Sequence, residues 1–226
     1  MKKRVLSILC TLALCLTLLP VAAEATEWEH SDHSSWTALT SDELIASNYA
    51  LSSGKYYLSG ADMGGGMYAL SLEQSITIPD GENVTLCLND VYCFPGFDSD
   101  YSPICDTAII VQEGGMLTIC DCSSNSSGSY LGGSGSMGGT GPAIENHGTL
   151  NIVSGNIGYG SQYPVIDNKE GATLSLGGSP DLYYISSAGT VSASCEGIPF
   201  TGSNYYNYYL YIDYTGDLGN PVVTNV

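Results

Sequence analysis

Gly114-Gly-Met-Leu-Thr-Ile-Cys120 holds the pattern on which the fold depends, a glycine turn followed by a short strand of alternating apolar residues. Segments 81–88, 148–153 and 171–176 align with it. The first apolar residues of the four segments are 33, 33 and 24 residues apart (Val84, Leu117, Leu150, Leu174), and second apolar residues follow two positions later (Leu86, Ile119, Ile152, Leu176). An earlier apolar pair precedes each segment: Ile76/Ile78, Ile109/Val111, Ala143/Ile144 and Val165/Ile166.

These units predict a repeating all-β structure in which each repeat is a strand, a tight glycine turn and a second strand. An imperfect repeat of this length with β character is typical of a solenoid, in which equivalent residues of successive turns stack in ladders. The stretches Asp90–Asp106 and Ser123–Gly141 are expected to be loop insertions, the second one mobile. A β-sandwich is the alternative architecture, but the aligned anchors and glycines favour the solenoid.

The segment before the repeats, residues 26–53, is expected to cap the first turn. Thr40 followed by Glu43 is a capping box and predicts a short helix running to about Asn48. A helix there covers the apolar end and the unpaired strand edge that a solenoid exposes. The polar stretch Thr26–Trp36 is expected to be loose, and residues 54–226 form the β domain.

Residues 1–25 have the three regions of a secretory signal peptide. Lys2-Lys3-Arg4 is basic, Val5–Leu19 is an apolar run of 15 residues, and Ala23-Glu-Ala25 is a small-residue cleavage site. The apolar run is short for a membrane span, which needs about 20 residues. We therefore expect a secreted, extracellular protein with no membrane span after cleavage, with attachment to a cell surface left open.

The charge of the exported chain restricts its partners. Removing Glu24 and the three leading bases leaves 22 acidic residues against Lys55 and Lys169, a net charge of −20. Nucleic acid is excluded as a partner, because phosphate contacts need a basic surface. The many glycines and tyrosines, 28 and 17 of 226 residues, are typical of a folded β domain and not of a disordered acidic tail.

Several strands resemble a known family. The segments Gly54–Leu58, Ile76–Pro79, Asn83–Asn89 and Leu117–Cys122 are similar to rungs of the right-handed parallel β-helix (pectate-lyase-like) surface proteins of Gram-positive gut bacteria. The resemblance covers about residues 36–190 and implies an adhesin-like role. The chain departs from that family in its small number of rungs and in lacking a Leu-Pro-x-Thr-Gly anchor signal, so either a small free-standing protein or a truncated one is expected.

Six of the eight cysteines lie beyond the leader, and export permits disulfides. Cys87 and Cys120 occupy equivalent positions in successive units, and stacked strands are about 4.8 Å apart, within the range that a disulfide spans. Cys87–Cys120 is therefore the leading candidate pair, and Cys93–Cys105 is a second one that would close the first insertion. Buried free thiols are the alternative. No metal or cofactor is expected, since Cys120-Asp-Cys122 has no partner Cys/His pair at zinc spacing.

No catalytic residues are predicted, because the acids lie mostly at turns and the exported chain lacks the arginine of pectate-lyase-like lyases. The best functional signal is the strand Tyr205–Tyr214. One face of this strand carries Tyr205, Asn207, Tyr209, Tyr211 and Asp213. Flat aromatic rings with polar groups at their tips are typical of a sugar-binding surface, and we call this face the glycan platform. We therefore expect a non-catalytic, adhesin-like protein that binds a glycan or a host or cell-wall ligand. The alternatives are a carbohydrate-active enzyme on the same scaffold and a structural fragment that needs a partner chain.

Overall fold

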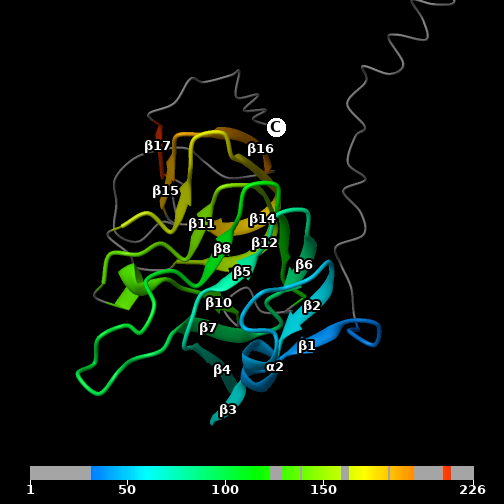
Figure 1. Cartoon of the computed structure of the whole chain (residues 1–226), viewed down its shortest axis with the longest axis vertical. Coiled ribbons are helices and arrows are strands. Elements are labelled where there is room, and N and C mark those ends of the chain that lie inside the picture. Colours follow the sequence, from blue (N-terminus) through cyan, green and yellow to red (C-terminus); the bar gives the residue numbers. More distant parts are fainter. Residues whose placement is uncertain are drawn as a thin grey trace, which may run out of the picture.

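The computed structural model describes residues 32–122, 129–137, 139–158, 163–182, 184–195 and 211–214, so the expected signal peptide lies outside it. The described chain is mostly β with one short helix (Figure 1). The elements are β1 (Thr37–Leu39), α2 (Ser41–Ala46), β2 (Gly54–Leu58), β3 (Ala61–Gly64), β4 (Met67–Leu72), β5 (Ile76–Ile78), β6 (Asn83–Cys87), β7 (Val91–Pro95), β8 (Ile109–Val111), β9 (Met116–Cys120), β10 (Tyr130–Leu131), η1 (Ser134–Met137), β11 (Ile144–Asn146), β12 (Thr149–Ile157), β13 (Ile166–Asn168), β14 (Thr173–Leu182), β15 (Tyr184–Ser187), β16 (Thr190–Cys195) and β17 (Tyr211–Tyr214).

The strands form two sheets to which successive units contribute in turn. One sheet has six strands in the order β17-β15-β13-β11-β8-β5, and the other has eleven, including the run β2-β6-β9-β12 with β14 and β16 added to it. Among the described strands every pairing is parallel except that of β3 with β4. This excludes the β-sandwich alternative for the described chain, because such sandwiches are built from antiparallel sheets.

The predicted anchors are in register with one another, as expected. Val84 pairs with Leu117, Leu117 with Leu150, and Leu150 with Leu174, and each of these side chains is fully buried. Leu86, Ile119, Ile152 and Leu176 form the second buried row. Because side chains alternate between the two faces of a strand, the same register that buries these rows turns the residues between them outward.

The eleven-stranded sheet curls around this interior (Figure 1). The long strand β12 explains the curl, because its first half pairs with β9 while its last residue, Ile157, pairs with Leu131 of β10.

The insertion Asp90–Asp106 was expected to be a loop, and that expectation is wrong in part, since it begins with β7. Val91 and Cys93 are buried and alternate with less buried residues, and β7 pairs in parallel with β4 in the eleven-stranded sheet.

The second insertion, Ser123–Gly141, also differs in part from the expected loop. Its described part contains β10 and the 3-10 helix η1. Ser134, at the start of η1, is fully buried, and its Oγ accepts a hydrogen bond from the Gly141 backbone N–H at 2.8 Å. The parallel pairing of β10 with β7 and β12 ties the segment to the rest of the molecule.

Asparagines replace apolar anchors in the later turns of the six-stranded sheet. The inward partner of Val111 is Asn146, which in turn pairs with Asn168. The predicted pairs Ala143/Ile144 and Val165/Ile166 are buried, but the second inward position is asparagine in both turns. Asn146 Nδ2 donates to Asn168 Oδ1 at 2.7 Å, and Asn168 Nδ2 donates to Ser187 Oγ at 2.9 Å. Side-chain amides stacked in this way form hydrogen bonds from one strand to the next, so the buried polar atoms are paired.

The short helix predicted after Thr40 is present and is shorter than expected. Thr40 accepts the Glu43 backbone N–H on its Oγ1 at 3.2 Å, as an N-cap residue does. The helix α2 ends at Ala46, not near Asn48, because Asn48 and Tyr49 adopt left-handed backbone with φ of 52° and 58°. It packs against β1 and β4, at the opposite end of the stack from β16 and β17 (Figure 1).

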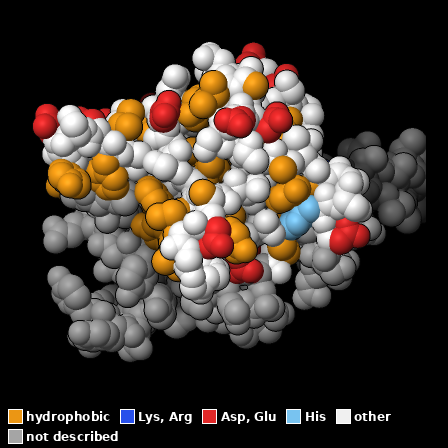
Figure 2. Space-filling model, turned by 90° about the horizontal axis from the view of Figure 1, so that it is seen from below, with side chains coloured by type: hydrophobic (Ala, Val, Ile, Leu, Met, Phe, Trp, Pro, Cys, Tyr) orange, Lys and Arg blue, Asp and Glu red, His pale blue; other side chains and the backbone are white. Residues whose placement is uncertain are grey.

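The surface of the described chain is acidic with scattered apolar side chains. Figure 2 shows acidic groups distributed between separate apolar ones on the face seen from below, with no lysine in view. The large exposed apolar residues include Met63 in the β3–β4 hairpin and Tyr101 in the loop after β7. Among the residues that the structure describes, no helix is long and apolar enough to cross a membrane.

We predict that Asn168→Ala lowers the free energy of unfolding by about 1–3 kcal/mol, because it leaves buried polar partners in adjacent turns without their hydrogen bonds. Urea denaturation followed by circular dichroism measures this change. Asn83→Ala is the matched control, since Asn83 is exposed and its loss should cost less than about 0.5 kcal/mol. Equal effects of the two substitutions would contradict the role given to the buried ladder.

Candidate functional site

Cysteines of successive turns meet at the ends of β6 and β9. Cys87 and Cys120 are direct partners in the parallel register. Cys122 follows two residues after Cys120, and its Sγ lies 3.4 Å from the Sγ of Cys87. Cys120 has a separate contact, because its thiol donates to the Leu86 carbonyl oxygen at 3.8 Å. The register therefore gives Cys87 two thiol neighbours.

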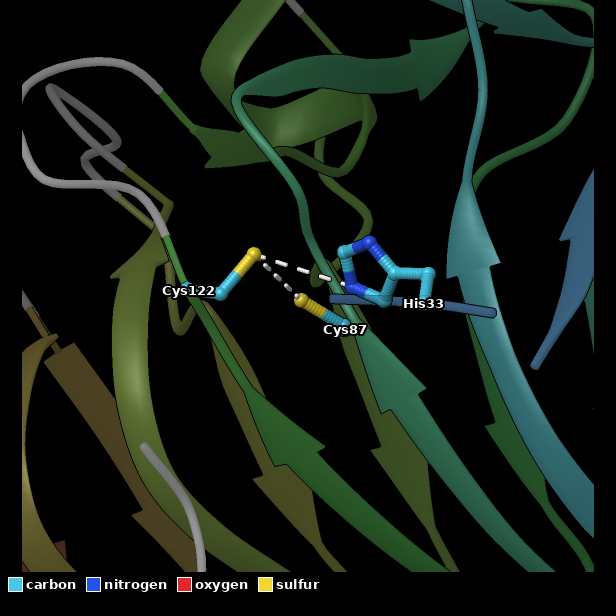
Figure 3. Close-up of side chains that lie close together, drawn as sticks. All are labelled: His33, Cys87 and Cys122. Carbon is cyan, nitrogen blue, oxygen red and sulfur yellow. Dashed lines mark hydrogen bonds between the residues drawn. The ribbon is translucent and has the colours of Figure 1, made fainter. Parts of the chain in front are cut away.

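His33 completes the cluster from the N-terminal segment, which was expected to be loose. Its Nε2 lies 3.6 Å from the Sγ of Cys122, and Figure 3 shows the three side chains pointing toward one another. The His33 ring stacks on Tyr57 of β2 with centroids 4.4 Å apart, and it meets the edge of Trp36 at 5.4 Å. These aromatic contacts hold the imidazole in place, so the expectation of a loose segment is wrong for His33 and Trp36.

Hydrogen bonding and burial raise the pKa values of the thiols in the cluster. Cys87 is fully buried and Cys122 is half-buried. Burial, followed by the nearby Cys87, raises the pKa of the Cys122 thiol to about 12. The pKa of Cys87 is raised mainly by its hydrogen bond with the Cys120 thiol and then by burial. Because the thiolate is the nucleophilic form of cysteine, the His33–Cys122 contact does not make an activated nucleophile.

The five cysteines whose side chains the structure describes are free thiols: Cys87, Cys93, Cys105, Cys120 and Cys122. The pairing Cys87–Cys120 is compatible with their adjacent register positions and stays a prediction. Cys93–Cys105 also stays a prediction, and burial followed by the proximity of Cys105 raises the pKa of Cys93 to about 12. Cys105 donates to the Leu72 carbonyl oxygen at 3.8 Å.

One ligand atom from each of His33, Cys87 and Cys122 lies within 4.8 Å of the other two, which is a grouping able to hold a metal ion. Sequence spacing did not reveal it, because the three residues come from distant parts of the chain. Cys122 is 35 residues from Cys87 and 89 residues from His33. The equivalence of Cys87 and Cys120 and the motif Cys120-Asp-Cys122 were the available signals. The motif was set aside for want of a Cys/His pair at zinc spacing, and no signal pointed to His33.

A second polar group lies on the outer side of the six-stranded sheet. Glu145 and Asp167 are paired in register on β11 and β13, whereas both were expected at turns. Lys169 Nζ lies 2.6 Å from Asp167 Oδ2 and 3.6 Å from Glu145 Oε1, and His147 Nε2 lies 2.7 Å from Glu145 Oε1. The hydrogen bond to Asp167 is the main cause that raises the pKa of Lys169.

The predicted glycan platform is described in part. Tyr211 and Asp213 lie in β17, paired with Tyr184 and Ser186 of β15, while Tyr205, Asn207 and Tyr209 lie outside the described residues. Ile212 pairs with the fully buried Ile185. The division of this strand into a core face and a glycan-binding face stays a prediction.

We predict that stability falls as the pH rises above about 8.5, the ordinary pKa of a thiol. The folded-state pKa values of Cys87 and Cys122 are raised, so the folded chain retains protons that the unfolded chain loses. The resulting stability is fully present below the unfolded-state pKa and is lost as the pH rises above it.

Urea denaturation of reduced protein between about pH 7.5 and 9.5, below the ordinary tyrosine pKa, measures this effect. A Cys87→Ala/Cys122→Ala variant is expected to show a flatter dependence on pH than the parent protein. The same slope in both proteins would contradict the assignment of this pH dependence to the cluster.

Comparison with known proteins adds no family to this picture. No protein-family model, no curated protein and no solved structure matches the chain. The role of these residues is therefore inferred from their own chemistry and geometry.

Proposed function

We propose that the protein is a secreted, non-catalytic β-helix that binds glycans on the outer side of its six-stranded sheet. The observation that carries this proposal is the position of β17, which pairs in parallel with β15 and so extends that sheet. In the six-stranded sheet, one residue from the interior of each strand pairs in register with its neighbour on the next strand. Together these residues form one row: Thr77, Ile110, Glu145, Asp167, Ser186 and Asp213. The tyrosine-rich strand thus continues a row that already carries acidic and hydroxyl groups.

The proposed scaffold is a right-handed parallel β-helix. Support comes from the alternation of successive strands between two parallel sheets and from the strong preference of parallel strand connections for the right-handed crossover. The resemblance to adhesin-like surface proteins of Gram-positive bacteria is further support. On such a scaffold the outer row is flat and regularly spaced, which suits a chain of sugar rings.

The chemistry of the row favours an uncharged glycan. Carboxylate and hydroxyl oxygens accept hydrogen bonds from sugar hydroxyls, and tyrosine rings pack on the apolar faces of sugar rings. Glu145 and Asp167 are partly exposed and are bridged by Lys169. An acidic polysaccharide would be repelled by the net charge of −18 that the whole chain carries.

A carbohydrate-active enzyme on the same scaffold is the second candidate. The adjacent carboxylates of Glu145 and Asp167 favour it, because glycoside hydrolases use two carboxyl groups on either side of the bond that they cleave. We favour binding because Lys169 forms an ion pair with both carboxylates, and the His147 ring lies at hydrogen-bond distance from Glu145. Product analysis distinguishes the two candidates.

We predict that the exported protein retains at least one neutral glycan in a screen of neutral glycans, acidic glycans and mucin, without releasing reducing ends or unsaturated products. The Tyr209→Ala/Tyr211→Ala variant should bind that glycan at least about tenfold more weakly, as loss of an aromatic anchor does. Asp167→Asn removes one carboxylate of the row and should likewise weaken binding of that glycan. Surface plasmon resonance gives the affinities.

The matched control is Tyr101→Ala, which removes a tyrosine that is 88% exposed in the loop after β7 and should leave the affinity unchanged. Unchanged binding by the Tyr209→Ala/Tyr211→Ala variant would contradict the platform. Turnover of any glycan, lost in Glu145→Gln, would replace the binding proposal with the enzyme candidate.

A further inference from the structure

We propose that His33, Cys87 and Cys122 bind one Zn²⁺ ion through Nε2 and the two Sγ atoms. This site is independent of the proposed glycan surface. It lies at the carboxyl ends of β6 and β9, where the N-terminal segment crosses them, and its ligand atoms all lie within 4.8 Å of one another. The arrangement is the one drawn in Figure 3.

The distances between the ligand atoms fit a tetrahedral ion. Zn–S bonds of about 2.3 Å and Zn–N bonds of about 2.0–2.1 Å at tetrahedral angles place two sulfurs about 3.8 Å apart and a sulfur and a nitrogen about 3.6 Å apart. The Sγ atoms of Cys87 and Cys122 are 3.4 Å apart, and Cys122 Sγ and His33 Nε2 are 3.6 Å apart. Two of the three ligand pairs are therefore within about 0.4 Å of their tetrahedral spacings, and the third pair, Cys87 Sγ and His33 Nε2, lies within 4.8 Å.

The donor set selects a thiophilic ion. Thiolate and imidazole ligands suit Zn²⁺, whereas Ca²⁺ and Mg²⁺ prefer oxygen ligands. Binding converts two neutral thiols to thiolates and releases their protons to solvent, so the ion replaces two protons at the cluster. The acidic chain, with a net charge of −18, also attracts a cation to this surface.

Surrounding contacts hold the ligands in position, as outer contacts do in metal sites. Tyr57 stacks on the His33 ring, and Trp36 meets its edge. Asn89 Oδ1 lies 3.7 Å from Cys122 Sγ, while its Nδ2 donates to the Leu58 carbonyl oxygen at 3.0 Å. The three protein ligands leave one position of a tetrahedral ion unfilled.

The proposed ion would cross-link three segments of the chain. His33 precedes β1, Cys87 ends β6, and Cys122 follows β9. A ligand that binds only the folded state stabilises it by mass action. The ion would therefore fasten the N-terminal segment to two successive turns and raise the resistance of this end of the molecule to unfolding.

The test uses the full exported chain, reduced and chelator-treated under anaerobic conditions, and titrated with Zn²⁺ in a calorimeter and with Co²⁺ in a spectrophotometer. We expect one equivalent of Zn²⁺ to bind, and Co²⁺ to give thiolate charge-transfer and tetrahedral d–d bands. Cys87→Ser and Cys122→Ser should abolish these bands, and His33→Ala should weaken binding at least about tenfold. No binding by the reduced parent protein would overturn the proposal.

Cys105→Ser is the matched control, because Cys105 is a half-buried thiol that bonds to the Leu72 carbonyl oxygen outside the cluster. It should bind Zn²⁺ as the parent does. Circular dichroism verifies that each variant is folded, and X-ray absorption of the Zn²⁺-loaded parent should show two sulfur ligands and one imidazole. The proposed zinc site would be overturned if folded Cys87→Ser or Cys122→Ser bound Zn²⁺ as the parent does. It would also be overturned if X-ray absorption showed no sulfur among the ligands of the bound Zn²⁺.

Discussion

The parallel register between the strands of successive repeat units is the constraint on which the rest of the structure depends. It places Val84, Leu117, Leu150 and Leu174 in one buried row. Because side chains alternate along a strand, a slip of one residue would turn the whole row to solvent and bring polar residues inside. The buried asparagine ladder adds a second requirement, since Asn146 and Asn168 find their partners only when neighbouring turns are aligned.

Both candidate sites follow from this register. It aligns Glu145 with Asp167 on the outer side of one sheet and Cys87 with Cys120 at the end of strands in the other. A disulfide and a metal ion would compete for Cys87, because a sulfur bonded to Cys120 cannot also act as a thiolate ligand. The predicted pairing and the proposed zinc site therefore describe the same thiol under oxidising and reducing conditions.

Sequence patterns predicted the parts of the fold that depend on local alternation. The anchors, the glycine turns between strands and the N-cap at Thr40 were found because each has a short-range signal. The inward asparagines were missed because a polar residue at a core position is identified only through its partner in the next turn. The strand β7 was hidden within an apparent loop, and His33 meets Cys122, 89 positions away, beyond the reach of any spacing rule.

Nuclear Overhauser effects between backbone protons of β6, β9, β12 and β14 test the central claim most directly. The account predicts parallel contacts that link Val84 to Leu117, Leu117 to Leu150, and Leu150 to Leu174. It also predicts slow amide exchange for Met116, Thr149 and Thr173, whose N–H groups donate to carbonyls of the preceding turn at 2.8–2.9 Å. Antiparallel contacts, or a register shifted by one residue, would contradict the account.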